Sequence, residues 1–306
     1  MLSRIAESLA WIGRYVERAD GTARIVDVVR LALIETKKTE PAEMVLSMIM
    51  GIEPPGSVDF NVVRDLLVFD TGNPSSIAGS WFSARENARR AREVLPLELW
   101  EVLNTAWFRW RNLGAPDASS RHLAWTRERA ALIRGVADST MGHDEAWDFL
   151  VLGRYLERAD MTARMVATGT LPLSGMSWTN VLAACGGVQA YAHSRRGVVD
   201  DEKLAAFLVL DRHFPRSVVY NLRQAEATLR RLSPDSASDR MGVSDEARRE
   251  LARVRTALEY RPLEEVLAGL GDDMQHVQEA VTAAATEVAR RYFPTGATTV
   301  WTGEVR

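Results

Sequence analysis

Carboxylates and arginines gather on one flank of the first predicted helix. Glu17, Asp20 and Arg24 follow one another at steps of three and four residues, so a helix turning ~100° per residue places them side by side. Arg14 lies three residues before Glu17, whereas Arg18 falls on the opposite flank. The spacing predicts an ion pair between Asp20 and Arg24. Such a group could form a polar cavity for a peptide, an amino acid or the end of a nucleotide.

The same residue types recur near the middle of the chain, where Arg154, Glu157, Asp160 and Arg164 repeat the spacing of the first group. Two interpretations are open, because structural ion pairs cluster as readily as functional sites do. In the preferred one, the two groups lie close together and form an ion-pair network that locks two halves of the molecule about a pseudo-twofold axis. In the other, they surround a ligand.

Arg216 and Ser217 form a second candidate site, because they follow a proline that suits the first position of a helix. Free N–H groups and the helix dipole favour an anion at such a place. Capping is the commoner role for a serine there. Helices are predicted to begin near Pro74 and near Pro215, with Asn73 as the cap of the first.

A third candidate is the polar run that contains Arg85, Glu86 and Asn87. Glu86 and Arg90 are four residues apart and could pair along a helix. A solvated helix face explains most runs of this kind, and a resemblance described below is what raises the first three residues above that explanation.

The usual marks of a catalytic or metal centre are missing from the sequence. The five histidines are scattered, and the nearest ligand pattern is His276 with Glu279 or Asp273, a single pair. Cys185 is the only cysteine and stands among small residues, which favours a buried side chain over a nucleophile. No phosphate-cradling loop, dinucleotide fingerprint or nucleophile elbow is present. We therefore expect no metal and no cofactor.

The charge balance argues against polyanionic partners. A net charge of −3 gives no field that would capture nucleic acid or an anionic membrane. The uncharged stretch 165–194 is interrupted by glycines and a proline, so we expect no membrane span. A lone cysteine precludes an intrachain disulfide, and charges interrupt residues 1–20 where a secretory signal would need an apolar run. These features predict a cytoplasmic protein.

An internal repeat organises all of these residues. The segment GRYVERADGTARIV at 13–26 recurs as GRYLERADMTARMV at 153–166, and LLVFDTGNPSSI at 66–77 recurs as FLVLDRHFPRSV at 207–218. Two matches in the same order imply a duplicated unit of about 140 residues. We therefore predict one domain over residues 1–306, composed of a repeat half 1–135, a repeat half 136–292 and a tail 293–306.

The elements that carry the candidate residues are predicted to be helices throughout. Apolar residues such as Ile5, Leu9 and Ile12 recur at helical spacing, and no convincing alternating strand is present. The fold class is therefore all-α, two pseudo-symmetric helical bundles. Further helices are predicted over 42–52, 79–95, 97–112, 119–139, 177–193, 201–210, 217–232, 244–258 and 262–292.

Four segments resemble the alpha-E family of bacterial all-helical proteins: MLSRIAESLAWIGRYVERADGTAR, SARENARRAREVLPLELWEVLN, FLVLGRYLERADMTARMV and FLVLDRHFPRSVVYNL. They occur in the expected order and cover most of the chain, and the second contains Arg85, Glu86 and Asn87. The resemblance implies a partner system with circularly permuted ATP-grasp ligases and with transglutaminase-like proteins. It therefore implies peptide or amide-bond metabolism.

We expect an accessory or substrate-binding subunit of such a system that is not itself catalytic, with a peptide or amino acid as its ligand. Two alternatives remain. One is an enzyme that uses the repeated Glu, Asp and Arg residues for acid–base or amidoligase-type chemistry. The other is a purely structural scaffold. Burial separates them, because carboxylates that converge on an open pocket favour binding or catalysis, whereas mutual saturation favours a structural role.

Overall fold

The computed structural model describes residues 1–36, 40–51, 58–114, 119–170, 176–194, 200–233 and 245–293, and within them every regular element is a helix. This confirms the predicted all-α class. The helices of the first part are α1 (Ser3–Thr36), α2 (Glu40–Met50), α3 (Phe60–Arg64), the π-helix η1 (Asp65–Phe69), α4 (Ile77–Arg90), α5 (Leu97–Arg111) and α6 (Ser119–Thr140).

The second part of the chain follows with α7 (Glu145–Gly169), α8 (Trp178–Ala184), α9 (Val188–Ser194), α10 (Asp201–Leu210), α11 (Val218–Leu232), α12 (Glu246–Tyr260), α13 (Leu263–Ala268) and α14 (Leu270–Tyr292). None of the described helices is long and apolar enough to cross a membrane.

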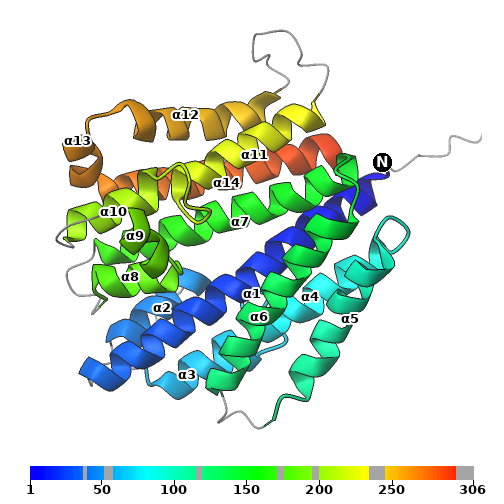
Figure 1. Cartoon of the computed structure of the whole chain (residues 1–306), viewed down its shortest axis with the longest axis horizontal. Coiled ribbons are helices and arrows are strands. Elements are labelled where there is room, and N and C mark those ends of the chain that lie inside the picture. The colour runs from blue at the N-terminus through cyan, green and yellow to red at the C-terminus, as the bar shows by residue number, and fades with distance from the viewer. Residues whose placement is uncertain are drawn as a thin grey trace, which may run out of the picture.

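Two long helices, α1 and α7, pack against each other in the middle of the molecule (Figure 1). On one side α1 contacts α4 and α6, and α5 lies against both of those helices. On the other side α7 contacts α11 and α14, and α12 lies against both of these. The predicted seam of α1 is its buried face, since Ile5, Leu9 and Ile12 are all at most 3% exposed.

Glycines set the distance between α1 and α7. A Cβ atom placed on Gly13 would lie 2.0 Å from the carbonyl oxygen of Leu150. A Cβ atom on Gly153 would lie 2.0 Å from the carbonyl oxygen of Ala10. Only glycine permits this approach, because no other residue leaves the space free. The charged side chains on both helices are thereby held within reach of the opposite helix.

Helices begin near Pro74 and Pro215 as predicted, but three residues after each proline, and Asn73 was wrong as the cap of the first. α4 begins at Ile77 and α11 at Val218, because the caps are serines that follow each proline rather than the proline or Asn73. The Ser76 hydroxyl accepts from the N–H of Gly79 at 2.8 Å, and the Ser217 hydroxyl accepts from the N–H of Tyr220 at 3.1 Å.

Other departures have local causes. The predicted helix 177–193 is broken into α8 and α9 at Gly186, where φ is +66°. The predicted helix 262–292 is broken at Gly269, which separates α13 from α14. Neither α3 nor η1 was predicted. Phe293 packs at 5.9 Å from the ring of Phe149, and the rest of the predicted tail, 294–306, lies outside the described residues.

Candidate functional site

Two Glu-Arg dipeptides face each other across the contact between α1 and α7. The guanidinium of Arg18 donates to Glu157 at 2.5 and 3.0 Å. The guanidinium of Arg158 donates to Glu17 at 2.5 and 3.0 Å. Each dipeptide therefore gives its arginine to the glutamate of the other helix, and both pairs use two parallel hydrogen bonds, the strongest form of this interaction.

Further arginines surround the carboxylates of α1. Arg134 of α6 lies 3.1 Å from Glu17 and 3.2 Å from Asp20. Arg216, from the turn before α11, contacts Asp20 closely and lies 3.7 Å from Glu17. Arg24 pairs with Asp20 at 3.0 Å, as its spacing predicted. Three helices and one turn thus contribute cations to two carboxylates.

The carboxylates of α7 have fewer partners. Arg14 lies 2.8 Å from Glu157, so the structure brings the two predicted groups together. Arg164 pairs with Asp160 at 2.8 Å and also donates to the carbonyl oxygen of Met48 in α2. We call the four carboxylates and their seven arginine partners the ion-pair cluster: Arg14, Glu17, Arg18, Asp20, Arg24, Arg134, Glu157, Arg158, Asp160, Arg164 and Arg216.

The four carboxylates of the ion-pair cluster are buried. Glu17, Asp20 and Glu157 are at most 3% exposed. Burial alone would raise the pKa of Glu157, but the charges and hydrogen bonds of Arg18 and Arg14 outweigh it and lower that pKa to about 2. The pKa of Glu17 is lowered well below its ordinary range, because Arg158 and its neighbours outweigh the same burial. These glutamates therefore remain ionised and paired at neutral pH.

Asp160 differs from the two glutamates. Burial raises its pKa, and the charge and hydrogen bond of Arg164 do not fully offset the effect. The Arg164 side chain is itself 32% exposed, so water weakens its influence. Asp160 is the least compensated carboxylate of the ion-pair cluster, yet it too is only 9% exposed.

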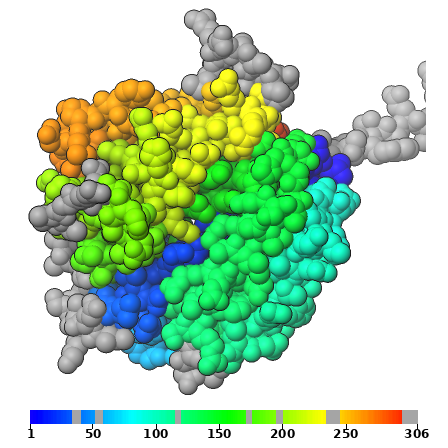
Figure 2. Space-filling view, in the orientation of Figure 1, coloured from blue at the N-terminus to red at the C-terminus, as the bar shows by residue number. Residues whose placement is uncertain are grey.

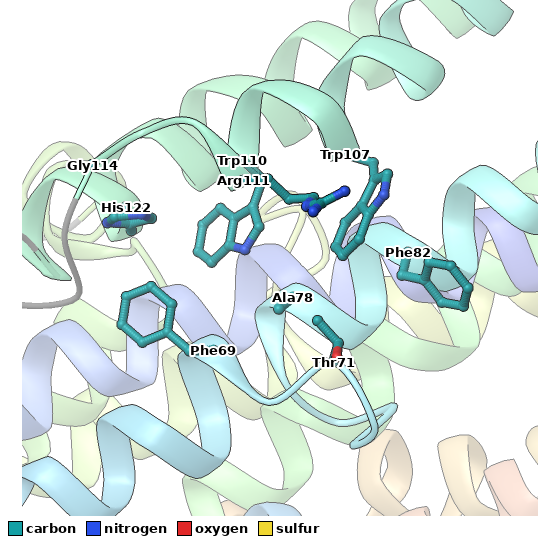
Figure 3. A pocket seen from close by; sticks show the side chains of 9 residues that line it. All are labelled: Phe69, Thr71, Ala78, Phe82, Trp107, Trp110, Arg111, Gly114 and His122. Atoms are coloured by element: carbon teal, nitrogen blue, oxygen red, sulfur yellow. The ribbon is translucent and has the colours of Figure 1, made fainter.

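A separate cavity of about 510 Å³ lies between η1, α4, α5 and α6 (Figure 3). Aromatic rings from all of these elements form much of its wall. Phe82 meets Trp107 edge-on at 5.4 Å, and His122 meets both Phe69 and Trp110 edge-on. We call this cavity the aromatic pocket, and its lining comprises Phe69, Thr71, Ala78, Phe82, Trp107, Trp110, Arg111, Gly114 and His122.

Residues 1–293 match the model of the Alpha-E family, described as a predicted alpha-helical domain with a conserved ER motif. The chain belongs to the Alpha-E family. Uncharacterized proteins Mb2597 of Mycobacterium bovis and Rv2567 of Mycobacterium tuberculosis are each 26% identical to it over 340 residues, which cover 97% of this chain. The chain spans 38% of the length of these relatives. No solved structure matches it significantly.

Several predicted site residues of this Alpha-E chain lie outside the ion-pair cluster. Arg154 pairs with Asp138 at 3.2 Å and stacks on Trp147. Ser217 caps α11, and Arg216 precedes that helix instead of lying in its first turn. The capping role preferred for Ser217 is confirmed, and the Arg216 guanidinium pairs with the buried carboxylates.

The polar run of α4 also stays separate. Arg85 donates to Asn104 of α5 at 2.9 Å, and Asn87 donates to a carbonyl of its own helix. Glu86 pairs with Arg85 and Arg89, so its predicted pairing with Arg90 was wrong. Arg85 thus links α4 to α5, the hydrogen bonds and ion pairs of Glu86 and Asn87 described above stay within α4, and none of the three joins the ion-pair cluster.

Three arginines of the ion-pair cluster were missed from the sequence. Arg18 was placed on the opposite flank and left out of the candidates, and its counterpart Arg158 was not considered; both reach the glutamate of the other helix. Their signal was available, because both follow the glutamate in each copy of the repeat. Arg134 gave no local signal, as 114 residues separate it from Asp20.

Proposed function

We propose that this Alpha-E domain is a non-catalytic accessory or substrate-binding subunit of an ATP-grasp-linked system for peptide or amide-bond metabolism. Its partner is a circularly permuted ATP-grasp ligase, with a transglutaminase-like protein as the second candidate, and its compartment is the cytoplasm. One observation carries the non-catalytic assignment. The repeated carboxylates, which were the strongest candidates for acid–base chemistry, are buried and each is paired with arginine.

A catalytic carboxylate must reach the proton that it transfers, and it must exchange protons near the working pH. Glu17 and Glu157 meet neither condition, because they are at most 3% exposed and their pKa values are lowered. Mutual saturation in a closed contact instead fits a structural lock between α1 and α7. We propose that the dipeptides Glu17-Arg18 and Glu157-Arg158 are this chain's form of the family's ER motif.

The reciprocal contacts also support our proposal that the chain arose by internal duplication. Arg18 bonds Glu157 as Arg158 bonds Glu17, and each of these residues lies 140 positions from its counterpart. An element that meets its own copy around an approximate twofold makes contacts in such exchanged pairs. The ion-pair cluster would then fix the orientation of two bundles that share one fold.

The relatives supply independent support for a partner. They match this chain over only 38% of their length, so most of each relative lies outside the Alpha-E region. A domain that occurs beside other sequence is expected to work with it. The scaffold alternative needs no ligand site, whereas the aromatic pocket gives the binding alternative a place for one.

Affinity capture from the native host tests this proposal. The chain is used as bait, and bound proteins are identified by mass spectrometry. The expected result is specific enrichment of a circularly permuted ATP-grasp ligase, with ATP turnover when the two are combined and none by the chain alone. ATP-dependent amide synthesis by the purified chain would overturn the non-catalytic assignment. Failure to enrich such a ligase would overturn the proposed partnership.

A further inference from the structure

We propose that the aromatic pocket binds a small carboxylate that carries an aromatic ring, such as an aromatic amino acid or the C-terminal aromatic residue of a peptide. This inference rests on the proposed function and names its ligand class. Three features carry it: partly exposed aromatic side chains, one arginine in the lining without a described carboxylate partner, and paired arginines at the positions 141 residues later in the chain.

The aromatic side chains are arranged to hold a ring. Phe82 is 41% exposed although it belongs to a pocket wall, and Trp107, which meets it at 5.4 Å, is only partly buried. Aromatic pairs prefer edge-on or offset contacts with centroids ~4.5–7 Å apart, so a third ring could join this arrangement at little cost. A volume of about 510 Å³ lies within the usual range for small-molecule sites, ~300–1,000 Å³.

Arg111 supplies the charge. Its guanidinium carbon lies 5.7 Å from the centre of the Trp107 ring, and Figure 3 shows its side chain extending from α5 towards that ring. Among the described residues, no carboxylate lies within 4.0 Å of it, whereas many arginines of this chain form ion pairs. A guanidinium on an aromatic face remains available for a carboxylate ligand.

The offset of the second sequence match leads from the aromatic pocket to charged residues. Counting 141 residues on from Thr71, inside that match, and from Phe82, just beyond it, gives Arg212 and Arg223. Both of those arginines pair with Glu259 of α12, at 2.9 and 3.2 Å, and the Glu259 side chain is only 4% exposed. A helix pair of this kind can therefore be closed by an ion-pair group, so the fold itself does not require the aromatic pocket.

Arg111 is the one arginine in the lining of the aromatic pocket, and its charge favours one class of ligand. A carboxylate carries one negative charge and matches the fork of one guanidinium. Nucleotide phosphates carry several charges and are usually held by more donors than one exposed arginine offers. An aromatic carboxylate satisfies both the ring faces and the charge of the aromatic pocket.

Titration calorimetry with N-acetyl-phenylalanine tests the inference, with N-acetyl-phenylalanine amide as the neutral probe. The acid should bind saturably, and more tightly than the amide by about 1.4-fold to fivefold, the range for one exposed ion pair. Arg111→Gln should abolish that difference. Trp107→Ala should weaken both probes at least about tenfold through the lost ring contact.

Matched variants on the same helix serve as controls. Trp100→Ala and Arg109→Gln remove the same side-chain types from α5 outside the aromatic pocket and should leave binding within about twofold of the parent. Circular dichroism confirms that each variant is folded. If Trp107→Ala does not fold, Phe82→Ala replaces it, because that ring is exposed.

Absence of saturable binding by the acid would overturn the inference, as would equal binding of acid and amide to the parent chain. Binding of adenosine monophosphate in preference to the acid would also overturn it. The ligase capture distinguishes the two proposals. Capture of the ligase without probe binding refutes the aromatic pocket alone, whereas probe binding without capture refutes the partner alone.

Discussion

Replacement of Glu17 by methionine is expected to destabilise the protein strongly, because it leaves Arg158 buried without a carboxylate. Arg158 is 8% exposed, and Glu17 is the one described carboxylate within 4.0 Å of its guanidinium. Removing one partner of a buried pair costs about 3–5 kcal/mol. An unfolding entropy of ~2.1 cal/mol/K per residue gives about 0.6 kcal/mol/K for 306 residues. The expected fall in Tm is therefore about 5–8 °C.

Replacement of Arg158 by methionine should lower the free energy of unfolding less than replacement of Glu17 does. In Arg158→Met, Glu17 keeps Arg134 and Arg216 as partners, so its charge stays compensated. The double variant Glu17→Met/Arg158→Met carries neither buried charge, and unbranched methionine fits the space of either stem. It should recover part of the loss caused by Glu17→Met alone. This order of stabilities follows from the contacts, not from the number of ion pairs removed.

Thermal unfolding followed by circular dichroism measures the Tm of the parent, the two single variants and the double variant. Glu287→Met is the matched control, since Glu287 pairs at 2.6 Å with an Arg290 side chain that is 72% exposed. Exposed pairs contribute little, so its Tm should change by less than about 1 °C. A similarly small change for Glu17→Met, or a double variant no more stable than that single variant, would refute the reasoning.

Three further predictions concern stability. The pKa of Glu157 is lowered from 4.5 to about 2, so its contribution to the free energy of unfolding is complete above pH 4.5 and is lost as pH falls towards 2. The Tm should therefore fall over this pH range in the parent, and less steeply in Glu157→Gln. Parallel curves of Tm against pH for the two proteins would contradict this prediction. Gly153→Ala should lower the free energy of unfolding by at least about 1–3 kcal/mol, because the new methyl group clashes with the backbone of Ala10. Gly135→Ala in α6 has open space around it and should raise the free energy of unfolding by about 0.5–1 kcal/mol. Equal urea midpoints for the two variants would argue against a close crossing of α1 and α7. Ser217→Ala should cost about 0.5–2 kcal/mol by removing the cap of α11, and a neutral urea midpoint would show that the hydroxyl is dispensable.

Much of the fold was predictable because the position of a helix depends on residues that are close together in the sequence. The seam of α1 repeats at helical spacing, and α5 was predicted at 97–112 and begins at Leu97. Helix ends were less predictable, since the choice between a proline start and a serine cap depends on the turn before the helix. Ser76 and Ser217 also donate to the carbonyl oxygens of residues 70 and 211. These contacts depend on the conformation of the preceding turn, which helical spacing does not predict.

The same division applies to the ion-pair cluster and the aromatic pocket. The pairing of Asp20 with Arg24 was predictable because the two residues lie on the same helix, one turn apart. The reach of Arg134 to Glu17 spans 117 residues and depends on how α6 packs against α1. The aromatic pocket was not predicted at all. Its tryptophans stand at helical spacing, as core residues also do, and only the packed structure shows that Trp107 borders open space.

The most direct test of the central claim, that the ion-pair cluster is structural and not catalytic, uses the double variant Glu17→Met/Arg158→Met together with the ligase identified by capture. ATP turnover of the combined proteins is measured well below the Tm of the variant, so that both chains are folded. We predict turnover within about twofold of the parent, because a structural lock can be replaced by apolar contacts. A folded variant that still captures the ligase but supports no turnover would contradict the claim.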